Sequence, residues 1–179
     1  MNLDDEQLVK ACIRRDQLAC KKLYDRFSAQ MYGVCLRYSR STAIAEDILH
    51  DGFIKVFDSL PKLRDVSSLS AWIRSIMIHT AISYWKSEHP FVDIDSVGDE
   101  PISRLSDSDD IYSAIDIEVI LKAVQELPDA YRMAFNLCAI EGYSFDDAAQ
   151  ELSIAPSSVR SNYVRARQAL AQKLKPYID

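Results

Sequence analysis

The sequence predicts an all-α protein made of two small helical domains joined by a flexible acidic linker. Glycine is scarce, with four in 179 residues, and no segment shows the β-branched alternation of a strand. Apolar residues instead recur at the 3.6-residue period of a helix in both halves of the chain. Between the halves, residues 88–110 are rich in Asp and Ser and contain two prolines. We therefore expect a domain over 1–87, a linker over 88–110 and a second domain over 111–179.

The first domain is expected to contain four helices. Thr42 can cap the third, which stops before Pro61 because a proline disfavours helix in the preceding residue. The expected helices cover about 4–14, 16–39, 43–60 and 70–86, with a loop over 61–69 before the last. Apolar stripes predict their core faces: Leu23, Phe27, Met31, Val34 and Tyr38; then Ile48, Leu49, Phe53, Val56, Phe57 and Leu60; then Trp72, Ile73, Ile76, Met77 and Ile82.

The second domain is expected to contain helices over about 111–127 and 129–141, and then two more. Gly142 suits the left-handed position that follows a helix. Ser144 and Asp147 have the spacing of a capping box, with Asp in place of the usual Glu or Gln, and open a helix that reaches Leu152. Pro156 suits the first position of the last helix, which extends to about residue 174. The short connection between these last two helices is typical of a helix-turn-helix.

The last helix carries a cluster of arginines in a chain whose net charge is −6. On a helical wheel, one side is predicted to face the core: Val159, Tyr163, Ala166, Leu170 and Leu174. Ser157, Ser161, Val164 and Gln168 lie roughly opposite, with Arg160 and Arg167 on one edge and Arg165 on the other. Small residues bordered by guanidinium groups suit a helix that enters a major groove. The alternative is a solvated face on which the arginines only increase solubility.

The EGYS turn, the Ala-Gln-Glu-Leu segment and the VRS…RAR segment all lie within residues 126–170. This stretch resembles region 4 of the extracytoplasmic-function (ECF) sigma factors. In the first half, AEDILHDGFIKVFDSLPKL over 45–63 is similar to the part of region 2 that grips the polymerase clamp. AWIRSIMIHTAISYWK over 71–86 is similar to the promoter-melting helix of region 2. The resemblance covers nearly the whole chain outside the linker.

The resemblance implies a dissociable initiation subunit that directs core RNA polymerase to specific promoters and assists their opening. Its partners would be the β′ clamp and β flap of core polymerase, promoter DNA and an anti-sigma factor. The implied minus-35 contacts are Ser157, Ser158, Arg160, Ser161, Val164, Arg165 and Arg167. The implied minus-10 contacts are Ser67, Ser68, Trp72, His79 and Ser83. The implied polymerase contacts are Asp47, His50, Asp51 and Phe53.

Several positions depart from the family pattern. His50 replaces the usual glutamine of the clamp segment, and His79 replaces the usual asparagine of the base pocket. Ser83 stands where an acidic residue is common, and Ser157-Ser158 replaces a Gly-Thr pair. Ser153 replaces the glycine of the turn, so this turn forms without the conformational freedom of glycine.

Two other functions remain open at this stage: a degenerate sigma-like interaction protein that opens no promoter, and a simple helix-turn-helix regulator. We expect no enzyme, cofactor or metal site, because the sequence shows no nucleophile–base pair, glycine-rich phosphate loop or ligand cluster. No apolar run is long enough to insert directly into a membrane, and the acidic amino terminus does not resemble a signal peptide. The expected location is cytoplasmic, with the four cysteines as buried or half-buried thiols.

Negative charge is concentrated at the linker, where residues 88–118 hold ten acidic residues and one basic residue. One interpretation is solubility and flexible spacing. The resemblance implies a second interpretation, in which the linker passes through polymerase near the active-site cleft and RNA exit path and its acidic residues mimic nucleic acid. A third is that the acidic segment shields the basic faces of the two domains from DNA until polymerase holds it away.

Overall fold

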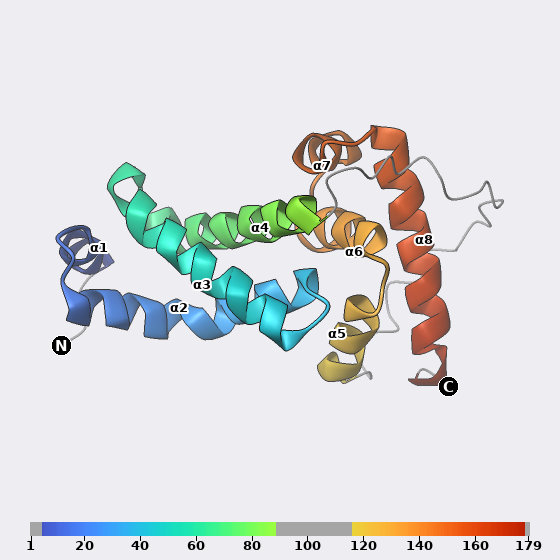
Figure 1. The fold of residues 1–179 in the computed structure, drawn as a ribbon, viewed down its shortest axis with the longest axis horizontal. Helices are drawn as coiled ribbons and strands as arrows, with labels where there is room; N and C mark the ends of the chain where they lie inside the picture. Colours follow the sequence, from blue (N-terminus) through green and yellow to red (C-terminus); the bar gives the residue numbers. More distant parts are fainter. Residues whose placement is uncertain (1–4, 89–115, 178–179) are drawn as a thin grey trace. The chain divides into compact units, whose positions relative to one another are not determined.

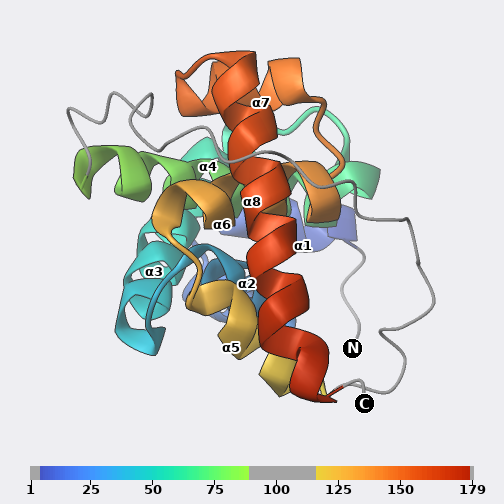
Figure 2. The same cartoon turned by 90° about the vertical axis from the view of Figure 1, so that its right-hand side faces the viewer.

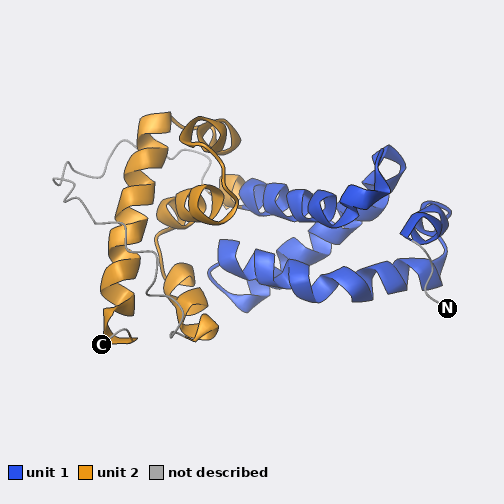
Figure 3. Ribbon diagram, turned by 180° about the vertical axis from the view of Figure 1, so that it is seen from behind, with its two compact units in different colours: residues 1–84 blue, residues 85–179 orange. Residues whose placement is uncertain are grey.

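The computed structural model describes residues 5–88 and 116–177, and every regular element in these ranges is helical. The predicted all-α fold class is therefore confirmed. The chain forms two compact units, Met1–Tyr84 and Trp85–Asp179 (Figure 3). The acidic linker lies outside the described residues except for Glu88, the last residue of a helix. The domain boundaries proposed from the sequence stay predictions. No helix in the described ranges is long and apolar enough to cross a membrane.

Unit 1 is built from one short helix and three long ones, the last of which continues four residues beyond Tyr84 (Figure 1). They are α1 (Asp5–Ile13), α2 (Gln17–Tyr38), α3 (Thr42–Ser59) and α4 (Leu69–Glu88), with short 3₁₀ turns η1 (Leu60–Lys62) and η2 (Val66–Ser68) between α3 and α4. The Asp16 side chain caps α2 by accepting from the Ala19 N–H at 2.9 Å. Ser41, and not Thr42 as predicted, caps α3, because its hydroxyl accepts from the Ile44 N–H while Thr42 is already helical.

The core of unit 1 lies between α2, α3 and α4. The predicted α2 stripe is confirmed, with all five of its residues buried. On α3, Phe57 is only half-buried, and on α4, Trp72 and Ile76 are half-buried, while the other predicted core residues of both helices are buried. The three-residue connection between α2 and α3 makes them antiparallel neighbours (Figure 1).

Two glycines inside these helices allow a matched test of packing. A Cβ at Gly52 of α3 would overlap the Sδ of buried Met77 and lie 3.0 Å from its Cε, whereas a Cβ at Gly33 of α2 has no atom within 4 Å. Gly52→Ala is expected to lower the free energy of unfolding by about 1–3 kcal/mol through overpacking. Gly33→Ala is expected to raise it by about 0.5–1 kcal/mol because alanine favours helix. Thermal or urea unfolding of the full chain checks both, and equal shifts for the two variants would contradict this account of the α3–α4 contact.

Unit 2 is built around its last and longest helix, α8 (Pro156–Leu174), which ends in a short turn, η5 (Lys175–Tyr177). Figures 1 and 2 show α7 (Phe145–Leu152) beside the N-terminal end of α8 and α5 (Ile117–Gln125) beside its C-terminal end. α6 (Asp129–Phe135) continues into the π-helical turn η4 (Asn136–Ile140). Ala166, Leu170 and Leu174 of α8 pack against residues of and just after α5 in one core cluster.

The sequence missed three features of the first half of unit 2. The helix expected over 111–127 begins, in the described part, at Ile117 behind the cap Asp116, and it ends at Gln125. The segment expected as one helix over 129–141 widens into π-type turns from Asn136 onward. Arg132 is buried, with 2% of its surface exposed. It pairs with Asp129 and donates to the Gln125 and Leu127 carbonyl oxygens at 3.0 and 2.8 Å. The Arg132 guanidinium group therefore holds together the turn between α5 and α6.

The helix-turn-helix of unit 2 follows the predicted signals closely. Gly142 has the expected positive φ of 76°. The Ser144 hydroxyl accepts from the Asp147 N–H at 3.1 Å, but the Asp147 carboxylate accepts from that same hydroxyl at 2.6 Å instead of from the Ser144 backbone. Ser153 adopts the left-handed conformation, with φ 59° and ψ 42°, at the end of α7.

Ser153 holds a backbone conformation that costs an L-residue about 1–2 kcal/mol relative to the right-handed one. Ser153→Gly is expected to raise the unfolding free energy slightly, by up to about 1 kcal/mol, because the relief exceeds the added freedom of the unfolded chain. Ser153→Val is the matched opposite, since a β-branched residue tolerates positive φ poorly. Calorimetry on the full chain checks the order of the three melting temperatures. If the Ser153→Val chain were as stable as the Ser153→Gly chain, the backbone at residue 153 would not be strained.

Candidate nucleic-acid interface

The face of α8 that the sequence assigned to DNA is not buried. Ser157 and Arg160 are exposed, and Ser158, Ser161, Val164, Arg165 and Arg167 are half-buried. The opposite side supplies Val159, Ala166, Leu170 and Leu174 to the core as predicted. Tyr163, predicted as core, is only half-buried, and Asn162 is buried in its place with 4% of its surface exposed. The predicted minus-35 residues thus share one accessible side of α8.

Aromatic rings lie under two of these arginines. Arg160 stands over the Phe145 ring, and Arg167 stands over the Tyr163 ring. A guanidinium group stacked in this way keeps its in-plane N–H groups, which match guanine O6 and N7 or a phosphate. The face therefore combines cationic edges with a centre of small residues, which suits close approach to a DNA duplex.

In unit 1, Asp65 organises the turn that carries the predicted minus-10 residues Ser67 and Ser68. Its carboxylate accepts from the Ser67 N–H at 2.9 Å and from the Ser67 hydroxyl at 2.7 Å, and its carbonyl accepts from the Ser68 hydroxyl at 2.8 Å. The Ser67 hydroxyl and N–H lower the pKa of Asp65. Both serines are exposed. Asp65 was not among the predicted site residues, although a Ser/Asp-rich turn before a helix is a usual signal of such a residue.

The other minus-10 candidates share one side of α4. Trp72, His79 and Ser83 are spaced by seven and four residues, which places them above one another on a helix. His79 and Ser83 are exposed, and Trp72 is half-buried, so its indole can both pack and reach outward. The Nδ1 of His79 lies 3.3 Å from the Ser75 hydroxyl, and the Ser83 hydroxyl donates to the His79 carbonyl at 2.8 Å. Ser75 was not singled out from the sequence.

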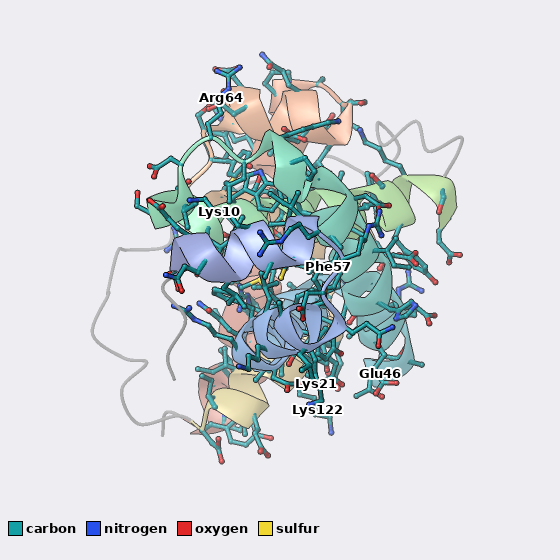
Figure 4. All side chains as sticks on the ribbon, turned by 90° about the vertical axis from the view of Figure 1, so that its left-hand side faces the viewer. Lys10, Lys21, Glu46, Phe57, Arg64 and Lys122 are labelled. Atoms are coloured by element: carbon teal, nitrogen blue, oxygen red, sulfur yellow. The ribbon has the colours of Figure 1, made fainter. Side chains whose placement is uncertain are left out.

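The predicted polymerase contacts on α3 divide into two groups. Asp47, His50 and Asp51 are exposed on one side, and Ile54, which the sequence analysis did not select, exposes 48% of its surface beside them. Phe53 exposes only 3%, and its ring packs 4.6 Å from the Tyr24 ring. Phe53 therefore supports α3 from within the core. Figure 4 labels Glu46, in the first half of this helix, and Phe57, in its last turn.

The described residues contain no cluster of three or more His, Cys, Asp or Glu side chains that could hold a metal ion. Cys12 and Cys35 are buried, and Cys20 and Cys138 are half-buried, with the Cys20 Sγ 4.0 Å from the Cys12 carbonyl oxygen. Burial, together with the neighbouring Cys20 thiol, raises the pKa of Cys12 to about 12. Burial likewise raises the pKa of Cys35 to about 12.

Comparison with known proteins gives consistent matches for both halves of the chain. Residues 23–90 match the family described as sigma-70 region 2, and residues 117–170 match the family described as sigma-70, region 4. Together the two matches span more than half of the chain. The first match contains α3 and α4, and the second contains α7 and α8 up to residue 170.

Two curated relatives match this chain over nearly its whole length. The chain is 26% identical to the ECF RNA polymerase sigma-E factor of Escherichia coli K12, over 98% of this chain and 97% of that protein. It is 27% identical to the RNA polymerase sigma-H factor of Pseudomonas aeruginosa, over 97% and 95%. Its fold is similar to that of the sigma factor RpoE from Bartonella quintana, solved with the anti-sigma factor NepR. That match has a TM-score of 0.53 and 23% identity, over 87% of this chain and 96% of that one.

Proposed function

Because this chain belongs to the ECF sigma factors of RNA polymerase, we propose that its two units carry the two halves of promoter recognition. Unit 2 binds the minus-35 element as duplex through α8. Unit 1 binds core polymerase through α3 and the melted minus-10 element through α4. The observation that carries this assignment is the accessible side of α8, where Arg160, Arg165 and Arg167 flank a centre of small residues.

The α8 face accounts for both affinity and specificity at the minus-35 element. Arginines at the edges neutralise phosphates, which gives sequence-independent affinity that falls with salt. Arg160 lies within the first turns of α8, the part of a recognition helix that contacts base edges. The small hydroxyl residues, Ser157, Ser158 and Ser161, let the backbone approach the groove. Val164 offers an apolar contact to a thymine methyl group.

The α4 face and the η2 turn account for promoter opening without ATP. An unpaired base must be stabilised once it leaves the stack, at a cost of a few kcal/mol. Trp72 supplies an aromatic surface for that purpose, and His79 supplies ring nitrogens that hydrogen-bond a base edge. Ser67, Ser68 and Ser83 add hydroxyl donors and acceptors around them. His79 stands where the family has asparagine, so the base preference of this chain at that position should be its own.

The α3 face is the proposed polymerase contact. Asp47, His50 and Asp51 present two carboxylates and an imidazole beside the apolar Ile54, a combination typical of a mixed protein interface. Phe53 acts here as support from the core.

The partners are core polymerase, through its β′ clamp and β flap, and promoter DNA. An anti-sigma factor is a further proposed partner, supported by the Bartonella relative that was solved with one. We place the protein in the cytoplasm and assign it no catalytic step of its own. A simple helix-turn-helix regulator is disfavoured, because such a protein has no need of the region 2 segment at 23–90.

A promoter library tests whether α8 reads the minus-35 element and α4 reads the minus-10 element. Core polymerase is mixed with wild type, Arg160→Ala or His79→Asn, and the transcribed sequences are aligned. Arg160→Ala should relax preference at the upstream element only, with a loss of about 1–3 kcal/mol of discrimination at one base pair. His79→Asn should change preference at the downstream element only. If either variant shifts the element assigned to the other, the proposed assignment is wrong.

A further inference from the structure

Two arginines of α8 stack on aromatic rings within unit 2. The guanidinium carbon of Arg160 lies 5.3 Å from the centroid of the Phe145 ring, and that of Arg167 lies 5.9 Å from the centroid of the Tyr163 ring. The two rings meet edge to face, with centroids 5.6 Å apart and planes inclined by 63°. Arg160, Phe145, Tyr163 and Arg167 therefore form one continuous series, which we call the arginine–aromatic ladder.

The ladder has the geometry of attractive contacts throughout. A cation within about 6 Å of a ring centroid is drawn to the face of the ring, and edge-to-face ring pairs prefer centroid distances of about 4.5–7 Å. Both rings are half-buried, so the surrounding side chains restrict their movement and each offers the arginine a well-defined ring face. Phe145 is the first residue of α7 and directly follows the cap Ser144. The position of the Phe145 ring is therefore determined by the start of α7 and not by α8.

Without the Phe145 ring, the Arg160 side chain could adopt another conformation. A cavity of about 350 Å³ adjoins the ladder, and its walls include Phe145, Arg160, Tyr163 and Asp146. In the described part of the chain, Arg160 forms no ion pair with Asp146 or with any other carboxylate. A shorter side chain at position 145 would enlarge the cavity and let the guanidinium group move toward the Asp146 carboxylate.

We propose that Phe145 and Tyr163 are positioning residues for promoter recognition, which hold the guanidinium groups of Arg160 and Arg167 ready for the minus-35 duplex. This inference rests on the proposed function of α8. A flexible arginine loses side-chain freedom when it binds DNA, and that loss weakens binding. The ladder removes part of this loss before DNA arrives, while the in-plane N–H groups stay available. Phe145 and Tyr163 thereby influence which base pair is read without contacting it.

A double-mutant cycle tests the inference. Holoenzyme is formed from core polymerase and the full chain, and its affinity for a promoter selected by the wild type is measured by competition. Phe145→Leu keeps an apolar side chain but removes the ring, and it should lower affinity by about two- to fivefold. In an Arg160→Ala background the same change should have no further effect. Phe145→Tyr should restore wild-type affinity. Phe145→Leu should also reduce selectivity at the base pair that Arg160 reads, which a loss of stability alone does not do.

Equal effects of Phe145→Leu with and without Arg160, or no effect in either background, would overturn the inference. An Arg160→Ala holoenzyme that binds the promoter as well as wild type would instead contradict the proposed function of α8. The melting temperature of each variant shows whether a loss of affinity comes from unfolding or from weaker DNA recognition. Tyr163→Leu and Tyr163→Phe, combined with Arg167→Ala, repeat the cycle at the other end of the ladder without altering Phe145, so the test stands even if Phe145→Leu folds poorly.

Discussion

Asp51→Arg is expected to weaken binding to core polymerase by about 30-fold or more, the effect of about 2 kcal/mol at an interface hot spot. Asp51 is exposed on α3 together with Asp47 and His50, on the side proposed to meet the polymerase clamp. Reversing one charge there removes an attractive carboxylate and places a cation against the surface that it had matched. Like charges brought together in an interface cost several kcal/mol. Transcription should fall in parallel, because promoter recognition requires the holoenzyme.

Glu6→Arg provides the matched control for Asp51→Arg. It changes the net charge by the same amount, on α1, where the exposed Glu6 carboxylate pairs with Lys10 at 3.4 Å. Equilibrium binding of a fluorescently labelled chain to core polymerase measures both variants, and circular dichroism confirms that both are helical. If Asp51→Arg binds core as tightly as Glu6→Arg does, the assignment of this face of α3 is wrong.

Arg132→Ala is expected to destabilise unit 2 by about 3 kcal/mol or more, since removing one partner of a buried ion pair leaves the other charge uncompensated. The side-chain surface of Arg132 is 3% exposed and that of Asp129 is 9% exposed. The substitution also removes the donors of the Gln125 and Leu127 carbonyls. Minus-35 recognition should then be lost at lower temperature than in the wild type, while unit 1 still melts at its usual temperature.

Lys173→Ala is the comparison for Arg132→Ala. Its ammonium group is 2.6 Å from the Glu126 carboxylate, in the same unit, but the pair is exposed. Lys173 lowers the pKa of Glu126, yet solvent screens such a pair, and its loss should change stability little. Scanning calorimetry of the full chain distinguishes the two. Similar melting curves for Arg132→Ala and Lys173→Ala would show that Arg132 does not hold the α5–α6 turn together.

Much of the fold was predictable because it depends on local signals. The apolar stripes of α2 and α8, the cap at Ser144 and the positive φ of Gly142 all follow from residue type and spacing. The apolar stripe also indicates which residues are too buried to contact a partner, and Phe53 is an example. Its position on the α3 stripe, one turn after Leu49, already indicated burial, and the structure places it in the core. A residue on an apolar stripe is a weak candidate for direct contact with a partner.

Other features could not be predicted, because they depend on contacts between elements. The Phe145 ring lies under Arg160 because α7 packs beside the start of α8, and sequence spacing does not encode that packing. The Tyr163 ring lies under Arg167 at the i, i+4 spacing of a single helix, which the sequence could have indicated. The burial of Arg132 depends on the carbonyls that end α5. Asn162 is buried and Tyr163 half-buried, which the apolar pattern alone did not indicate because asparagine is polar and tyrosine apolar. The turns at 136–140 have the i→i+5 hydrogen bonds of a π-helix, and no residue type in this segment signals that change.

The most direct test of the central claim is run-off transcription by core RNA polymerase on a library of promoter-sized DNA, with and without this protein. We predict selective transcripts that appear only with the protein and that share two upstream elements. Binding to core polymerase without any transcript would contradict it and would indicate a degenerate sigma-like protein. A chain that does not bind core polymerase at all would refute the sigma assignment entirely.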